Sequence, residues 1–262
     1  MKSAFRYASL VLPLLAGCSR VGDIFGSSSG NACGSGTTYT AGSSVSATKG
    51  VNDCKGPSGL DGQLYSMTVG QQTNIRVTVA TSAFTPLVEV FTANNTLFGE
   101  TLSGGVLSAF LPAGSYRIFV SSTAGPGGAF TLTTPTTTLG GGCLSASGNV
   151  ADGDMGYTLK GASFGGQIIA TDCGALNAKM HWYRVRLSGT DTLVSTVTVD
   201  KPAGVYLINS AGTVITTKEL PDAGTWSYTY PSTADGVYSL RIESRAVGTV
   251  SNLPLNYTVA LK

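Results

Sequence analysis

Histidine and charged residues are scarce in this 262-residue chain. His181 is the only histidine, and 11% of the residues are charged. A catalytic triad, or a zinc site built on imidazole ligands, would have to use that one side chain. The G-x-S-x-G motif of many serine hydrolases is also absent. These absences disfavour an enzyme.

The chain has no long apolar run and no convincing amphipathic helix. The apolar run at residues 8–15 is too short to span a bilayer, and Lys2 and Arg6 precede it. This pattern is typical of a signal peptide over residues 1–17. The following letters LAGC, ending at Cys18, resemble the lipobox of bacterial lipoproteins.

That resemblance implies cleavage before Cys18, a lipid on its sulfur and a membrane-anchored protein outside the cytoplasm. Ser19 follows the cysteine, which is compatible with sorting to the outer membrane or the cell surface. Residues 18–36 are then the lipidated cysteine and a flexible tether.

Clusters of basic residues are missing as well. Removing Lys2 and Arg6 with the signal peptide leaves fourteen of the sixteen basic residues, against fourteen acidic ones. Nucleic-acid binding needs clustered Lys and Arg, so we expect no nucleic-acid partner. The 42% of apolar residues is too high for a disordered chain.

Four cysteines remain once Cys18 is assigned to the lipid: Cys33, Cys54, Cys143 and Cys173. An even number in an exported chain indicates two disulfides, for which three connectivities exist. Chain order favours Cys33–Cys54 and Cys143–Cys173. Zinc is the competing interpretation, but the close C-x-x-C spacing of zinc sites is absent.

The second half of the chain repeats the first. Asp53-Cys54 recurs as Asp172-Cys173 at an offset of 119 residues. Two further blocks recur at offsets of 118 and 122, the first containing Tyr65 and Tyr183 and the second Tyr116 and Tyr238. A nearly constant offset over three blocks predicts two homologous domains in tandem.

Within each half, apolar residues alternate with polar ones, as in the sequence NIRVTV at residues 74–79. This period of two is typical of strands with one buried face, and Gly, Pro, Asn and Asp interrupt the chain about every ten residues. We therefore predict an all-β protein of two antiparallel, jelly-roll-like β-sandwich domains. The predicted segments are domain 1 at residues 37–134 (with Cys33), a linker at 135–142 and domain 2 at 143–262.

Each half also resembles the bacterial pre-peptidase C-terminal domain. The resemblance lies in the strand at Tyr65 or Tyr183, the alternating strand after it, and three later blocks in each half: PLVEVF, AGSYRI and AFTLTT, then AGVYLI, DGVYSL and NYTVAL. It implies a jelly-roll-like β-sandwich of the kind found beside secreted peptidases and in other exported proteins. No peptidase domain accompanies the two halves here.

Asp172, Cys173 and His181 lie close together in sequence and suggest a thiol nucleophile with its base. The repeat argues against this interpretation, because Asp172-Cys173 has a duplicate whereas His181 lies over Gln63. We predict that Cys173 closes a structural disulfide. His181 would begin a core strand and be incidental.

Two other features are candidate binding sites. Trp226, Tyr228 and Tyr230 fall on one face of a strand, which suits either a core row or a platform for stacking sugar rings. Their apolar counterparts Leu107, Ala109 and Leu111 favour the core. Separately, Asp152 and Asp154 lie in a Gly-rich turn and form a candidate calcium site.

These features predict a lipid-anchored envelope protein that is not an enzyme and has no cofactor apart from the candidate calcium. The leading function is a surface binding or adhesion module for polysaccharide or protein. The alternative is a structural or self-assembling envelope component, stabilised by calcium.

Overall fold

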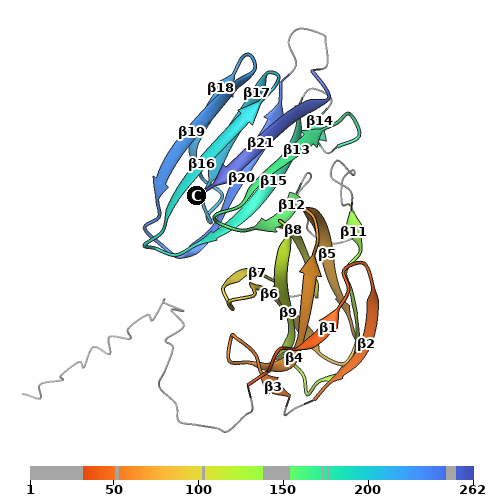
Figure 1. The fold of residues 1–262 in the computed structure, drawn as a ribbon. Helices are drawn as coiled ribbons and strands as arrows, with labels where there is room; N and C mark the ends of the chain where they lie inside the picture. Colours follow the sequence, from red (N-terminus) through yellow and green to blue (C-terminus); the bar gives the residue numbers. More distant parts are fainter. Residues whose placement is uncertain are drawn as a thin grey trace, which may run out of the picture.

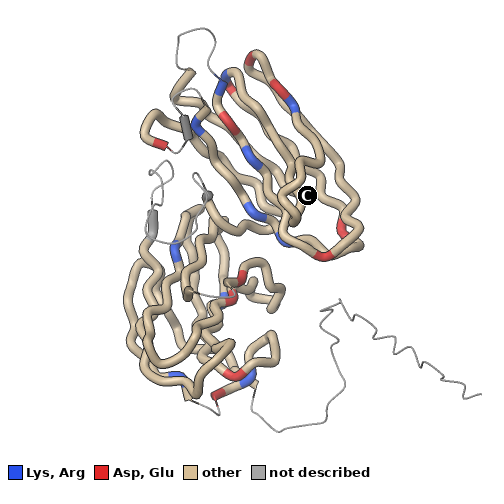
Figure 2. The backbone as a smooth tube through the Cα atoms, turned by 180° about the vertical axis from the view of Figure 1, so that it is seen from behind, with Lys and Arg blue, Asp and Glu red and all other residues tan. Residues whose placement is uncertain are grey.

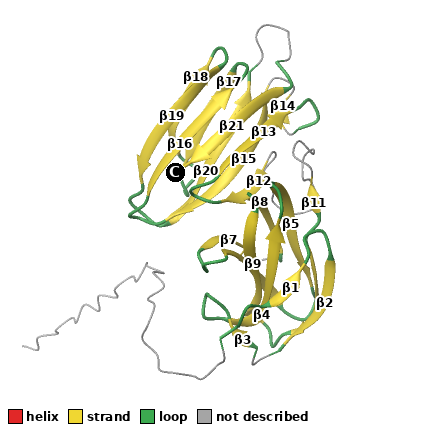
Figure 3. Ribbon diagram, viewed as in Figure 1, coloured by secondary structure: helices red, strands yellow, loops and turns green. Residues whose placement is uncertain are grey.

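The computed structural model describes residues 32–50, 53–101, 104–137, 154–172, 174–175, 178–245 and 252–262. Every regular element in these segments is a β-strand, which confirms the all-β prediction (Figure 3). The described segments contain no helix able to cross a membrane. The predicted signal peptide, Cys18 and most of the tether lie outside the described residues.

The first ten strands form two facing sheets, which we call repeat 1 (Figure 1). One sheet has the order β1-β4-β9-β6-β7, with β3 paired to β4, and the other contains β8-β5-β10-β2. The strands are β1 Thr37–Tyr39, β2 Ser44–Lys49, β3 Cys54–Lys55, β4 Asp61–Val69, β5 Thr73–Ala80, β6 Thr85–Thr92, β7 Leu97–Thr101, β8 Val106–Leu111, β9 Gly114–Ala124 and β10 Gly128–Thr133.

Ten later strands repeat this order and make up repeat 2. Their sheets are β12-β15-β20-β17-β18, with β14 paired to β15, and β19-β16-β21-β13. The strands are β12 Asp154–Thr158, β13 Ser163–Ile168, β14 Gly174–Ala175, β15 Ala178–Leu187, β16 Thr192–Val199, β17 Ala203–Ile208, β18 Val214–Leu220, β19 Gly224–Pro231, β20 Gly236–Ser244 and β21 Leu255–Leu261.

Strand register follows the sequence repeat. Tyr65 of β4 lies opposite Ile118 of β9, and Tyr183 of β15 lies opposite Leu240 of β20, at the predicted offsets. Each repeat also has a tyrosine whose hydroxyl donates to a backbone carbonyl four residues earlier, at 2.8 Å from Tyr116 and 3.2 Å from Tyr238. The sandwiches are not wholly antiparallel, because β1 pairs with β4, and β12 with β15, in parallel.

Apolar residues that alternate in sequence fill two large hydrophobic clusters, one in each repeat. An aromatic ring crosses between them in each direction. Phe110 of β8 lies in the repeat 2 cluster, 5.2 Å between ring centroids from Tyr183, and Tyr157 of β12 lies in the repeat 1 cluster. Each repeat therefore contributes one aromatic side chain to the hydrophobic core of the other, and these contacts hold the two cores together.

The joint between the repeats is a strand pairing. Strand β12 pairs with β15 on one side and β8 on the other, so one sheet runs through both repeats (Figure 1). Gly156 makes this approach possible, because a Cβ there would lie 2.2 Å from the carbonyl carbon of Ser108. The buried Asn74 amide also donates to the Met155 carbonyl at 3.1 Å.

The predicted linker is partly structured. Thr136 and Thr137 form the short strand β11 (Thr136–Thr137), which pairs with β5 of repeat 1. Residues 138–142 of the linker, and the start of domain 2 at Cys143, lie outside the described residues. The domain limits stay predictions.

Candidate functional site

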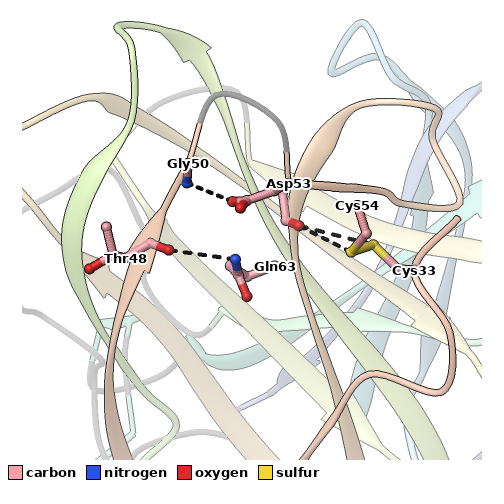
Figure 4. The surroundings of a disulfide bond; sticks show 7 residues. Cys33, Thr48, Gly50, Asp53, Cys54 and Gln63 are labelled. Carbon is pink, nitrogen blue, oxygen red and sulfur yellow. Dashed lines mark hydrogen bonds between the residues drawn. A yellow bond between two sulfur atoms is a disulfide. The ribbon is translucent and has the colours of Figure 1, made fainter. Parts of the chain in front are cut away.

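The disulfide predicted between Cys33 and Cys54 is confirmed (Figure 4). Beside it, the Asp53 carboxylate accepts the backbone N–H of Gly50 at 2.8 Å and holds the turn before β3. Cys143 and Cys173 lie outside the described residues, so their disulfide stays a prediction, as does lipidation of Cys18.

Asp172 repeats the role of Asp53 by accepting the backbone N–H of Ile169 at 2.7 Å. It also meets His181, whose Nε2 lies 3.1 Å from the Asp172 Oδ2. The imidazole Nδ1 lies 2.7 Å from the hydroxyl of Tyr257, which is hydrogen-bonded to that of Tyr183. The expectation that His181 is incidental is therefore wrong. We call these four side chains (Asp172, His181, Tyr183 and Tyr257) the buried network.

The buried network has one arrangement in which the imidazole N–H and both phenol O–H groups each donate to an acceptor within it. A neutral imidazole carrying its proton on Nε2 donates to Asp172 and accepts from Tyr257 at Nδ1. Tyr257 in turn accepts from Tyr183. Burial raises the pKa of both tyrosines, so both phenols stay protonated.

Repeat 1 lacks this network although it keeps the turn. Register places Gln63 at the position of His181 and Phe130 at that of Tyr257. Gly166 makes room in repeat 2, because a Cβ there would lie 2.3 Å from the Tyr257 hydroxyl. The blocks AFTLTT and NYTVAL already pair Phe130 with Tyr257 in the sequence, but only the folded strands show that Tyr257 contacts His181. His181 is 3% exposed, so the network is closed to ligands and has a structural role.

The aromatic row of β19 faces the core, as the apolar counterparts indicated. Trp226 is 8% exposed and stacks on Tyr228 with ring centroids 5.8 Å apart. Tyr228 and Tyr230 are half-buried against the repeat 2 cluster. Register places Tyr228 at the position of Leu107, two residues before Ala109, its counterpart in the sequence comparison. A shift of two residues leaves the row on the same face of the strand.

The structure does not test the candidate calcium site. Asp152 and the side chain of Asp154 are outside the described residues. In the segments that are described, no three His, Cys, Asp or Glu side chains gather in a way that could hold a metal ion.

A different aromatic row, missed in the sequence, lies on the outer face of repeat 2. Trp182 of β15, Arg241 of β20 and Tyr206 of β17 are direct cross-strand neighbours. The Arg241 guanidinium lies 3.9 Å from the Tyr206 ring centroid and 5.1 Å from that of Trp182. All three are partly exposed. We call them the Trp–Arg–Tyr row.

Ion pairs continue this row toward the sheet edge. Arg245 pairs with Glu219 of β18 at 2.7 Å and also with Glu243, and its guanidinium holds the pKa of Glu219 below the ordinary value. Arg241 approaches Glu243 at 3.4 Å. Figure 2 shows basic and acidic positions side by side along these strands. The outer face of repeat 2 therefore combines aromatic rings with paired charged groups.

The signal for this face was present in the sequence HWYRVRL at residues 181–187. The core residues Tyr183, Val185 and Leu187 alternate there with Trp182, Arg184 and Arg186. An aromatic residue at an outward position of a strand, in line with arginines, is unusual for a purely solvated face. The partners Tyr206 and Arg241 come from other strands and could not be paired with it without the topology.

A cleft opens where this outer face meets repeat 1. Its volume is about 540 Å³. The β6–β7 hairpin of repeat 1 supplies Thr92, Asn94 and Thr96, and repeat 2 supplies the segment from Thr158 to Gly161 together with Arg186, Asp191 and Lys262. Arg186 also pairs with Glu100 of β7. The cleft therefore exists only because the two repeats are joined.

No family model matches the chain, and no curated protein matches it in sequence. Among solved structures it is similar to the pre-peptidase C-terminal domain of a Bacillus anthracis collagenase, at 12% identity and a TM-score of 0.30 over 37% of this chain and 92% of that one. It is also similar to PliG from Aeromonas hydrophila, a periplasmic lysozyme inhibitor of g-type lysozyme, at 17% identity and a TM-score of 0.29 over 38% of this chain and 96% of that one.

A third similar structure is the tandem domain CBM22-1-CBM22-2 of a Paenibacillus barcinonensis protein. Its identity is 11% and its TM-score 0.21, over 76% of this chain and 82% of that one. The first of the three belongs to the family that the two halves resemble in sequence. These likenesses concern the fold alone.

Proposed function

We propose that the protein is a lipid-anchored, extracytoplasmic binding module that is not an enzyme and takes polysaccharide on the outer face of repeat 2. Supporting an extracytoplasmic location are the residues before Cys18 and the Cys33–Cys54 disulfide, since disulfides persist mainly outside the cytoplasm. Supporting a non-catalytic role is His181, the only imidazole, which is sealed inside the buried network.

The observation that carries the proposal is the Trp–Arg–Tyr row. Trp, Tyr and Arg are the residues most often found at the energetic centre of binding surfaces. Arg241 is held between two rings, so little conformational entropy is lost when it binds a ligand. Rings suit the C–H faces of sugars, and the paired Arg245 and Glu219 offer donors and acceptors to sugar hydroxyls.

A binding screen on the full-length chain tests this proposal, with surface polysaccharides and surface proteins as probes. Trp182→Ala and Tyr206→Ala should each weaken polysaccharide binding at least tenfold with an unchanged melting temperature. The matched control is Thr229→Ala, an exposed position on the outer face of the opposite sheet. Binding of a protein but no polysaccharide, or equal binding by all variants, would overturn the proposal.

A second candidate function, a self-assembling envelope component, is favoured by strand β19. In the described part of the chain β19 is an edge strand, eight residues long and without a charged side chain. Its counterpart in repeat 1, β8, is paired on the corresponding side by β12. Edge strands of this kind accept further strands from other molecules.

Light scattering after size-exclusion chromatography tests self-assembly. Ser227→Lys, on the edge strand, should convert oligomers to monomers, whereas Thr196→Lys on the neighbouring inner strand β16 should not. A monomeric wild-type chain at all concentrations would exclude this candidate. Repeating the measurement with calcium, in the wild type and in Asp154→Ala, tests the calcium prediction.

A further inference from the structure

We infer that the cleft between the two repeats binds an uncharged saccharide ring. The inference rests on the proposed polysaccharide function and adds to it a second binding position and a ligand class. The cleft, of about 540 Å³, falls within the size range of small-molecule sites and is partly open to solvent.

Two of the three basic side chains that line the cleft are already paired with carboxylates, which favours an uncharged ligand. Lys160 pairs with Asp191 at 2.6 Å, and Asp191 also accepts the backbone N–H of Ser188 at 2.7 Å. Arg186 is paired with Glu100. An anionic ligand would have to displace these carboxylates, whereas a neutral hydroxyl-rich ligand can hydrogen-bond to pairs that stay intact. Lys262 adds one further ammonium group among the lining residues.

The rest of the lining suits the two kinds of surface on a pyranose ring. Leu97 and Leu159 are half-buried and offer apolar contact to the C–H face of a sugar. Asn94 and Thr96 are exposed on the repeat 1 wall and can donate to or accept from ring hydroxyls. A small-ligand site usually combines an apolar patch with a few polar groups that point toward the ligand.

The repeat 1 wall is held in shape before any ligand arrives. Within the turn between β6 and β7, the Thr92 N–H donates to the Thr96 carbonyl at 3.0 Å and the Thr96 N–H donates to the Thr92 hydroxyl at 3.2 Å, while the Asn95 side chain accepts from Arg117 at 2.7 Å. Asn95 adopts the left-handed conformation, at φ 63°, that closes the turn. A preformed wall lowers the entropy lost on binding.

The cleft and the Trp–Arg–Tyr row share strand β15. Trp182, Arg184 and Arg186 occupy successive outward positions of β15, and Arg186 lines the cleft. Successive outward positions are about 7 Å apart, so Trp182 and Arg186 are separated by roughly 13 Å. A polysaccharide of three or more sugars could therefore occupy the row and the cleft together.

NMR titration of the full-length chain with neutral oligosaccharides tests the inference, with oligosaccharides of uronic acids as the charged comparison. The methyl signals of Leu97 and Leu159 report on the cleft, and the indole N–H of Trp182 reports on the row. We expect neutral sugars to shift both sets. The double variant Asn94→Ala/Thr96→Ala should weaken binding at least fivefold, and Ser46→Ala/Thr48→Ala, on exposed positions of β2, should not.

The outcomes separate the two claims. Shifts at Trp182 alone would leave the proposed function standing and overturn the cleft site. Shifts at Leu97 and Leu159 alone would support the cleft site and overturn the row. Stronger binding of uronic acid oligosaccharides, or no shift at either place, would overturn the inference.

Discussion

His181 and Tyr257 are joined by a 2.7 Å hydrogen bond inside the core of repeat 2. At the corresponding positions repeat 1 has Gln63 and Phe130, which cannot make it. The chain thus contains both versions of the same site, one with a buried polar network and one with an apolar ring.

Replacing Tyr257 by Phe should destabilise the protein by about 1–3 kcal/mol, because it leaves His181 Nδ1 and the Tyr183 hydroxyl buried without partners. His181→Gln should cost a similar amount by leaving the Asp172 carboxylate short of a donor. The double variant reproduces the side chains of repeat 1. We expect it to cost less than the sum of the single variants, because the lost interactions are shared.

Urea unfolding of the wild type, both single variants and the double variant measures this coupling. Tyr65→Phe, in repeat 1, controls for losing a tyrosine hydroxyl outside the network. Strictly additive costs would mean that His181 and Tyr257 do not act as a unit.

The ion pair between Lys160 and Asp191 should make stability depend on acidity. The hydrogen bond from Lys160 and the backbone N–H of Ser188 lower the pKa of Asp191 to about 2. The Asp191 carboxylate therefore binds a proton more weakly in the folded state than in the unfolded chain, where the pKa of an aspartate is about 3.9. The stabilisation is fully present above about pH 4 and is lost as the pH falls through 2.

Melting temperatures of the wild type and Asp191→Asn should accordingly differ at pH 7 and converge near pH 2. Asp222→Asn, at an exposed turn position, is the control. A difference that stayed constant over this range would show that Asp191 acts through something other than its charge.

Disulfide mapping should find two intramolecular bonds. Non-reducing mass spectrometry is expected to recover Cys33–Cys54, which the structure contains, and Cys143–Cys173, which the order of the cysteines predicts. The first closes a separation of 21 residues, so removing it with Cys33→Ser/Cys54→Ser should cost about 3 kcal/mol in the chain-entropy description. An alkylatable Cys173 in the oxidised protein would contradict the second bond and reopen a thiol role for that residue.

The lipid anchor can be tested in a bacterial host. Cys18→Ala should move the protein from the membrane fraction to the soluble fraction, because it removes the only predicted site of acylation. Labelling with a radioactive fatty acid should follow the same pattern. Unchanged membrane association without Cys18 would assign the attachment to another part of the chain.

Sequence patterns were sufficient for features that depend on local chemistry. Alternation placed Ile75, Val77 and Val79 on a buried face, and all three are buried in β5. The even number of cysteines and their order along the chain indicated the disulfide of repeat 1. Each depends on neighbours in sequence or on comparison of one half with the other.

Features that depend on contacts between distant strands could not be found in this way. The Trp–Arg–Tyr row joins β15, β20 and β17, and only the strand order brings these residues together. The same is true of Phe110 and Tyr157, whose alternation indicates a buried face but not that each lies in the core of the other repeat. Both features depend on which strands pair in the folded protein.

Gly156 provides a last test, on the joint that creates the cleft. Gly156 and Gly161 both have φ near +92°, so alanine adds the same backbone strain at either position, about 1–2 kcal/mol. A Cβ at Gly156 would also lie 2.2 Å from the Ser108 backbone, whereas nothing lies within 4 Å of one at Gly161. Gly156→Ala should therefore lower the melting temperature well beyond Gly161→Ala. Equal effects of the two variants would mean that the repeats do not depend on the close approach of β12 and β8.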